Sequence, residues 1–121
     1  MGLPKLNRLK HWRDFQRVYK QGTCHHGRYL VLRKWSTDQD SFGLTPPQIG
    51  IVVGKKVSKK ATLRNRIKRQ IRAILQDFLP SLKPGQKLII GVKPKARECE
   101  YEHFLRELEQ LLRKAEVLNG H

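Results

Sequence analysis

The sequence predicts a two-layer α/β sandwich in a single domain spanning residues 1–121. Three observations support this prediction. The chain has 121 residues, of which 38% are hydrophobic, which is enough for one compact core. Helical and strand-like hydrophobic patterns follow one another in the order α-β-β-α-β-α, which is typical of helices packed on a small sheet. Turn residues such as Gly22 and Pro84-Gly85 separate these patterns.

The N-terminal part of the chain contains one predicted helix and one clear strand. Residues 11–20 place apolar side chains at helical spacing, and Gly22 ends this helix. Residues 28–36 alternate between apolar and other side chains, as a strand with one buried face does. Residues 22–27 could add a further short strand before it.

The middle of the chain is predicted to contain a loop, a buried strand and a long helix. Residues 37–48 are polar with two prolines, which favours a loop, and the β-branched residues 49–53 favour a buried strand. Thr62 is a plausible N-cap for a helix that begins at Leu63 and stops at Pro80.

The C-terminal part is predicted to add one strand and one helix. The apolar residues 88–92 favour another buried strand, and residues 101–114 repeat the helical pattern. We expect the two ends, residues 1–5 and 116–121, to be flexible.

Charge is the dominant feature of the composition. There are 26 Lys and Arg against 10 Asp and Glu, which gives a formal net charge of +16. All six Glu come after residue 97, so the excess of positive charge belongs to the part before it. Like charges repel in a compact fold, and a polyanion removes that cost. Nucleic acid is therefore the expected partner, because Lys and Arg that bind phosphates release condensed counterions.

The sequence also indicates a compartment. It contains no apolar run long enough to cross a membrane and no apolar segment typical of a signal peptide. Its two cysteines do not form a disulfide framework. We therefore expect a cytoplasmic protein with no membrane partner and with both thiols reduced.

The most basic stretch is residues 55–72, in which nine of eighteen residues are Lys or Arg and none is acidic. The basic side chains that fall within the predicted helix lie opposite its apolar stripe or beside it. Cations near a helix N-terminus oppose the helix dipole, and a purely structural surface helix would be expected to include Glu as well. The stretch therefore predicts a phosphate-binding surface, whose candidate residues are Lys55, Lys56, Lys59, Lys60, Arg64, Asn65, Arg66, Lys68, Arg69 and Arg72.

Three ordered motifs resemble the protein subunit of bacterial ribonuclease P. They are residues 6–22, which contain the run DFQRVYKQG, residues 54–69, which contain RNR, and Lys93-Pro94 after an apolar strand. The similarity spans about residues 6–112. It implies the topology αβββαβα with a left-handed βαβ crossover, as in the second domain of ribosomal protein S5. Such crossovers are right-handed in nearly all other proteins.

The resemblance also implies a function. In that family a catalytic RNA holds the metal ions, chiefly Mg²⁺, and hydrolyses the phosphodiester bond that releases the 5′ leader from precursor tRNA. The protein would assist by binding the catalytic RNA through the RNR helix. It would bind the leader in a cleft between the first helix and the sheet. No catalytic residue is then expected in the protein itself.

Carried onto this sequence, the leader cleft would contain Phe15 and Tyr19. A third aromatic residue commonly lies on the first long strand of the family, where this chain has Arg33. Trp35 points to the same side of that strand, so either Arg33 or Trp35 could provide the third contact. Aromatic stacking suits leaders of varied sequence, because every base has a π-face. Trp12 is expected to belong to the core instead.

The sequence offers little for catalysis by the protein alone. Asp38 and Asp40 form the one DxD pair, and the Glu residues of the last helix suit i,i+4 pairs such as Glu109 with Arg113. The run Cys24-His25-His26 lacks a second pair of ligands at the spacing of a zinc site, so no metal site is expected.

Two other functions fit the same charge. A ribosomal-type RNA-binding protein would use the basic helix without an aromatic cleft. A DNA-binding module would need base-reading side chains, and few residues of the helix beyond Asn65 and Gln70 suit that role. The sequence leaves the oligomeric state of a holoenzyme open.

Overall fold

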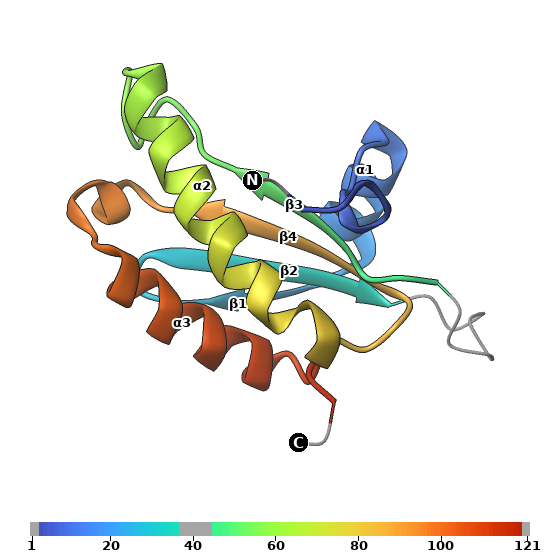
Figure 1. The fold of residues 1–121 in the computed structure, drawn as a ribbon. Helices are drawn as coiled ribbons and strands as arrows, with labels where there is room; N and C mark the ends of the chain where they lie inside the picture. Colours follow the sequence, from blue (N-terminus) through green and yellow to red (C-terminus); the bar gives the residue numbers. More distant parts are fainter. Residues whose placement is uncertain (1–2, 37–44, 120–121) are drawn as a thin grey trace.

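The computed structural model describes residues 3–36 and 45–119, and Figure 1 shows their arrangement. The order of elements is α-β-β-β-α-β-α, so the short strand near residue 23 is present. The main elements are α1 (Trp12–Gln21), β1 (Thr23–His26), β2 (Leu30–Ser36), β3 (Gln48–Val52), α2 (Ala61–Phe78), β4 (Gln86–Val92) and α3 (Tyr101–Lys114). Three short 3-10 turns join them: η1 (Lys5–Asn7), η2 (Leu79–Ser81) and η3 (Pro94–Glu98).

The four strands form one mixed sheet in the order β1-β2-β4-β3. β1 and β2 are antiparallel, as are β2 and β4, whereas β3 and β4 are parallel neighbours joined through α2. In Figure 1 α2 lies in front of the sheet, both parallel strands run to the left, and β4 lies below β3. That path is a left-handed crossover, the rare form that the family resemblance implied.

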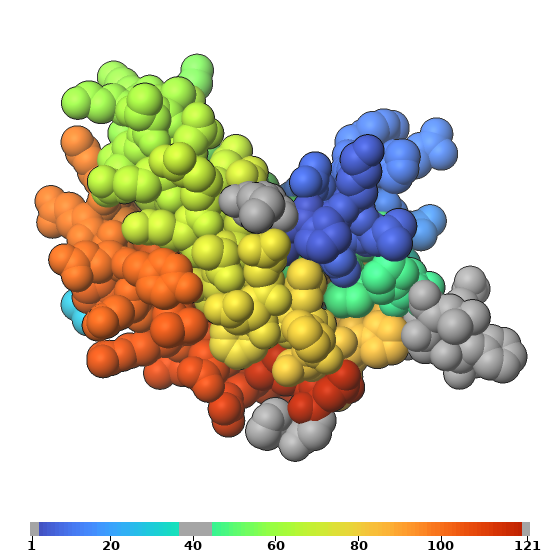
Figure 2. Space-filling model, viewed as in Figure 1, coloured from blue at the N-terminus to red at the C-terminus, as the bar shows by residue number. Residues whose placement is uncertain are grey.

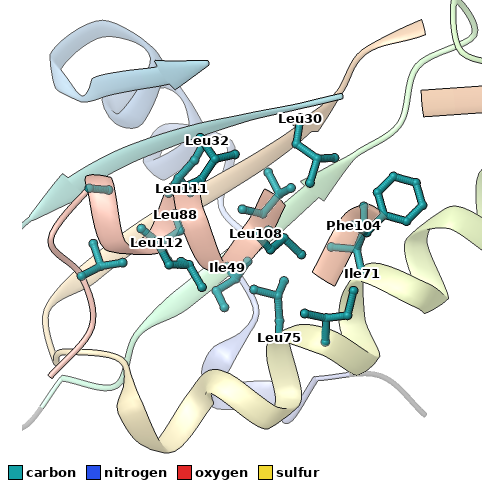
Figure 3. Close-up of a cluster of buried hydrophobic side chains, with 14 of the residues drawn as sticks. Leu30, Leu32, Ile49, Ile71, Leu75, Leu88, Phe104, Leu108, Leu111 and Leu112 are labelled. Carbon is teal, nitrogen blue, oxygen red and sulfur yellow. The ribbon is translucent and has the colours of Figure 1, made fainter. Parts of the chain in front are cut away.

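The main core lies between one face of the sheet and the helices α2 and α3. Alternate residues of the strands point into it, and the apolar stripes of both helices cover them (Figure 3). Among its fully buried side chains are Leu30, Leu32, Ile67, Ile71, Ile74, Leu75, Leu88, Ile90, Phe104, Leu108 and Leu111. This continuous aliphatic layer fixes α2, so its outer face is held rigidly toward solvent.

The opposite face of the sheet carries α1 and a much smaller cluster. Leu9, Val18 and Ile89 are buried there, with Phe15 and Trp35 packed against them. The N-terminal segment is held beside β3, because the Leu9 amide donates to the Ile49 carbonyl at 3.0 Å.

Two local expectations are corrected by the structure. Trp12 is not a core residue: its side chain is 64% exposed at the start of α1. Thr62 is not the N-cap, because α2 begins at Ala61 and Lys60 occupies the N-cap position. The Ser58 hydroxyl accepts the Lys60 amide hydrogen at 3.1 Å, so the chain turns into the helix before Thr62.

The ends of the chain and the long loop were also subjects of prediction. Leu3, Val117 and Leu118 are buried in the core, so the terminal stretches expected to be flexible contain packed side chains. Of the predicted loop 37–48, residues 37–44 lie outside the described residues. The same holds for Asp38 and Asp40.

Candidate nucleic-acid interface

One interface is built where α1 crosses the sheet. Arg33, Ile89 and Gly50 lie side by side on β2, β4 and β3, as the strand register shows. Phe15 contacts Gly50, Val18 packs with Ile89, and Tyr19 stacks with Arg33. Positions three and four apart share one side of a helix, so α1 places these contacts across three strands.

Phe15 lies directly on the backbone of β3. A Cβ atom at Gly50 would be 2.6 Å from Cζ of the Phe15 ring, which is closer than side chains approach one another. Only glycine lets the ring lie this close to the strand. Phe15 is half-buried and forms one wall of a cavity of about 450 Å³.

This cavity joins the two surfaces that the sequence predicted separately. Its other lining residues come from the N-terminal segment, β3 and α2, and Figure 2 shows the surface hollowed between the N-terminal part of the chain and α2. Arg8 and Arg72 add positive charge to a lining whose other residues are apolar or glycine. The Nε atom of Arg8 donates to the Leu3 carbonyl at 2.6 Å, which fixes this side chain at the cavity.

Tyr19 lies beside open sheet. It is 47% exposed, and the guanidinium carbon of Arg33 lies 4.9 Å from its ring centroid. The next row of the same sheet face consists of Val31, Gly91 and Val52, of which Val52 is 40% exposed. A flat, small-residue floor next to aromatic rings suits a single strand with unstacked bases.

Arg33 and Trp35 lie on opposite sides of α1. Arg33 stacks with Tyr19, whereas Trp35 lies below Arg17, whose guanidinium carbon is 5.3 Å from the Trp35 ring centroid. Trp35 also packs against the small buried cluster under α1. The structure therefore places Arg33 with Phe15 and Tyr19, and it leaves Trp35 apart from them.

A salt bridge fixes α1 on the Trp35 side. The amino group of Lys87 lies 3.0 Å from the Asp14 carboxylate, and both side chains are mostly buried. The same amino group lies 6.0 Å from the Trp35 ring centroid. The Trp35 side of α1 is therefore occupied by contacts within the protein.

The second candidate surface is the outer face of α2. Asn65, Arg66 and Arg69 are exposed, whereas Arg64, Lys68 and Arg72 are half-buried. Arg64 does not simply extend into solvent: its Nη1 atom donates to the carbonyls of Ser58 and Lys59, at 2.9 and 3.0 Å. Arg64 thus ties residues 53–60, the loop by which the chain approaches α2 (the approach loop), to the helix.

The approach loop presents further cations. Lys55, Lys56, Lys59 and Lys60 are all exposed. Between them Val57 and Ser58 are buried at 3% and 7% exposure, so the loop is anchored to the core. The lysines consequently occupy defined positions next to the first turn of α2.

The remaining titratable groups do not gather into a site in the part of the chain that the structure describes. No three His, Cys, Asp or Glu side chains there lie close enough together to hold a metal ion. Cys24 is exposed, with its sulfur 3.4 Å from Nε2 of His26. The predicted pair of Glu109 with Arg113 is confirmed at 2.9 Å. No helix among the described residues is long and apolar enough to span a membrane.

Six of the eight residues that line the cavity, among them Arg8, Leu9 and Gly50, were not predicted as site residues. Arg8 and Leu9 lie within the first recognised motif, but hydrophobic periodicity gives no role to residues outside an element. Gly50 sits inside an apolar strand, and a glycine at such a position is the one signal that something approaches the backbone closely.

The chain is similar to proteins of one family. The family model described as Ribonuclease P matches residues 3–116. The ribonuclease P protein components of Rippkaea orientalis and Microcystis aeruginosa are each 52% identical to it over its full length, and the match covers 95% and 100% of those proteins. A solved structure of a Staphylococcus aureus ribonuclease P protein mutant has a TM-score of 0.84 at 29% identity, covering 94% of this chain and 92% of that one.

Proposed function

Since the chain belongs to the ribonuclease P protein family, we propose that it binds the catalytic RNA of ribonuclease P and the 5′ leader of precursor tRNA, and so assists removal of the leader. The family is that of the protein component of a tRNA-processing endoribonuclease. The observation that supports the finer assignment is the arrangement of Phe15 and Tyr19 beside an open sheet face, with Phe15 at the cavity that Arg72 of α2 also lines.

In this proposal α2 and its approach loop bind the catalytic RNA. Arg66 and Arg69 are exposed, and their planar guanidinium groups suit bidentate contact with phosphates. The loop lysines add point charges next to them. Because Arg64 already donates to the loop, its contribution is to position those lysines rather than to bind RNA alone.

The leader would lie along the other face of the sheet. Tyr19 and Phe15 provide stacking without reading base edges, which matches a substrate segment of variable sequence. Arg33 stays against Tyr19 and so presents a charge for the adjacent phosphate. Arg8 and Arg72 would likewise present positive charge to a phosphate at the cavity.

Hydrolysis itself is assigned to the RNA subunit in this proposal. Mg²⁺ prefers several oxygen ligands, and the described residues of this chain do not bring such a set together. The side chains of the described residues therefore do not fit a resident magnesium ion, and we propose that the RNA holds it. No step of the proposed role runs through a protein-bound metal.

The central test is reconstitution with the catalytic RNA of the source organism. We expect the protein alone to leave precursor tRNA intact and to stimulate release of the 5′ leader by that RNA at low Mg²⁺. Cleavage of precursor tRNA by the purified protein without RNA would refute the proposal, as would a lack of stimulation.

Two kinds of variant separate the two surfaces. Arg66→Ala and Arg69→Ala should weaken assembly with the RNA, whereas Lys114→Ala, at the far end of α3, is the charge-matched control. Tyr19→Ala should instead reduce the preference for precursor over mature tRNA, by about 1–3 kcal/mol for one lost stacked base. Tyr101→Ala removes a comparably exposed ring on α3 and is its control. Equal loss of both properties in both kinds of variant contradicts the two-surface arrangement.

The alternative function is that of a ribosomal-type RNA-binding protein, and single-strand binding distinguishes the two. Such a protein would bind a short single strand no better than its charge predicts. Binding of a leader-length oligonucleotide that is unchanged by Tyr19→Ala would favour this alternative.

A further inference from the structure

One end of the sheet gathers three cationic segments. β3 and β4 are parallel neighbours, so the approach loop after β3 and η3 after β4 leave the sheet at the same end. Leu30 pairs with Val92, which brings the turn between β1 and β2 to this end as well. Besides the four loop lysines, the segments contribute Arg28, Lys93, Lys95 and Arg97.

The turn between β1 and β2 is held by a buried carboxylate. Glu107 of α3 is only 9% exposed, and its two oxygens accept the amide hydrogens of Arg28 at 2.5 Å and Tyr29 at 2.8 Å. A Cβ atom at Gly27 would lie 2.5 Å from the Glu107 carboxyl carbon, so the turn and α3 are in close contact. The amino group of Lys93 donates to the Gly27 carbonyl at 2.7 Å. The turn is therefore rigid before any ligand arrives.

A second cavity lies against this turn. It measures about 400 Å³ and is lined by Arg28, Tyr29, Pro94, Lys95, Arg97 and Glu98. The three cations are exposed, and Glu98 is the single acid of the lining. Arg28 lies over the Tyr29 ring, with its guanidinium carbon 5.4 Å from the ring centroid. Stacking on the ring orients the guanidinium while its donors stay available.

The cavity is on the side of the sheet that carries α2 and α3. Tyr29 packs against the main core, and its ring meets His103 of α3 edge to face at 5.9 Å. The candidate leader surface is on the other side, under α1. The cavity thus lies at the same end of the sheet as the approach loop, and its lining includes neither Phe15 nor Tyr19.

We infer that this cavity is a third RNA contact, in which Arg28, Lys95 and Arg97 bind backbone phosphate of the catalytic RNA. The inference rests on the proposed function and extends the surface for that RNA beyond α2. Glu107 acts as a positioning residue, because it holds the turn that carries Arg28.

The test compares the double variant Arg28→Ala/Arg97→Ala with wild type in binding to the catalytic RNA over a series of salt concentrations. Two lost phosphate contacts should reduce the slope of log K against log salt by about 1 each. Affinity at low salt should fall roughly tenfold or more, because the lost contacts no longer release counterions. The preference for precursor over mature tRNA in the assembled enzyme should not change.

The control is Lys83→Ala/Lys114→Ala, which removes the same charge at the other end of the sheet. If it lowers the slope as much as the test variant, general charge explains the effect and the inference is wrong. A changed preference for precursor tRNA with unchanged RNA affinity would assign the cavity to the leader and overturn it too. Wild-type protein that does not bind the RNA at all refutes the proposed function instead. Glu107→Gln, which keeps the shape but removes the charge, should weaken binding less than the double variant.

Discussion

The two faces of the sheet are covered in different ways. On one face α2 and α3 bury a continuous aliphatic layer that includes Leu88, Ile90 and Leu108, all at 0% exposure. On the other face the buried cluster formed by the described residues consists of Leu9, Val18 and Ile89, and the contacts around it include cations stacked on rings. The first face holds the fold together, and the second keeps aromatic and charged groups accessible.

This difference explains how a small, highly charged chain combines stability with binding. Burial of apolar area is the main stabilising contribution to folding, and here it is concentrated on one side. The α1 side can then expose Tyr19 and Val52 without loss of the core. Substitutions on the two faces should therefore change different properties.

The largest effect is expected from truncating the main core. Leu108→Ala leaves a cavity between α3 and the sheet, and it should lower the free energy of unfolding by about 2–5 kcal/mol. Chemical denaturation followed by circular dichroism measures this change. Where the variant remains folded, its affinity for a single-stranded oligonucleotide should equal that of wild type. A folded variant with selectively weakened single-strand binding would show that the two faces are not independent.

A smaller loss of stability is expected from Glu107→Ala. The substitution leaves the amide hydrogens of Arg28 and Tyr29 without their acceptor, at a cost of about 1–3 kcal/mol where they stay out of water. Glu109→Ala, one turn away, removes only an exposed i,i+4 pair and should cost less than about 0.5 kcal/mol. Equal denaturation midpoints for the two variants would contradict the structural role of Glu107.

On the α1 face, Gly50→Ala should displace the Phe15 ring. The new methyl group would overlap Cζ of Phe15, so the ring must leave the strand and lose its stacking position. Single-strand affinity, measured by fluorescence anisotropy, should fall by about 1–2 kcal/mol, in the range of one stacked base. Gly54→Ala is the matched control, because a Cβ there meets no atom within 4 Å and Gly54 lies outside the open sheet face beside Tyr19. Similar losses in both variants would exclude a specific role for Phe15.

The smallest effect concerns the two thiols. Burial, and secondarily the Glu107 carboxylate, raises the pKa of the Cys99 thiol. Less thiolate is therefore present at a given pH, and Cys99 is also less exposed than Cys24. Maleimide labelling at pH 8, located by peptide mass spectrometry, should modify Cys24 first. The rate at Cys99 should rise as the pH increases, since a raised pKa delays ionisation. Faster labelling of Cys99 would contradict the packing of the α3 N-terminal region.

Most of the fold could be predicted because its elements have clear periodicity. The apolar stripe of α2 through Ile67, Ile71 and Ile74 follows from spacing alone. The failures occurred where periodicity does not determine burial. Trp12 shares the helical spacing of Phe15 and Val18, but it is the first residue of α1 and its side chain is 64% exposed. The left-handed crossover could not be derived from the residues and came from family resemblance.

The candidate site could be predicted in its residue types but not in its contacts. The alternation of β2 put Arg33 and Trp35 on one face, yet it could not show that α1 separates them. Likewise, helical geometry placed Arg64 beside the cationic stripe, but its hydrogen bonds to Ser58 and Lys59 depend on how the loop turns. Gly27 and Glu107 meet across the fold, so no local pattern links them.

The stacked cations have a consequence for the protein before it meets RNA. Arg13, Arg17, Arg28 and Arg33 each lie over an aromatic ring of the same chain. Exposed rings promote self-association, and a guanidinium placed on each one lowers that tendency while adding mutual repulsion between copies. Arg28 and Arg33, which we propose bind RNA, should thereby also oppose self-association of the unbound protein, so their removal should increase aggregation as well as weaken binding.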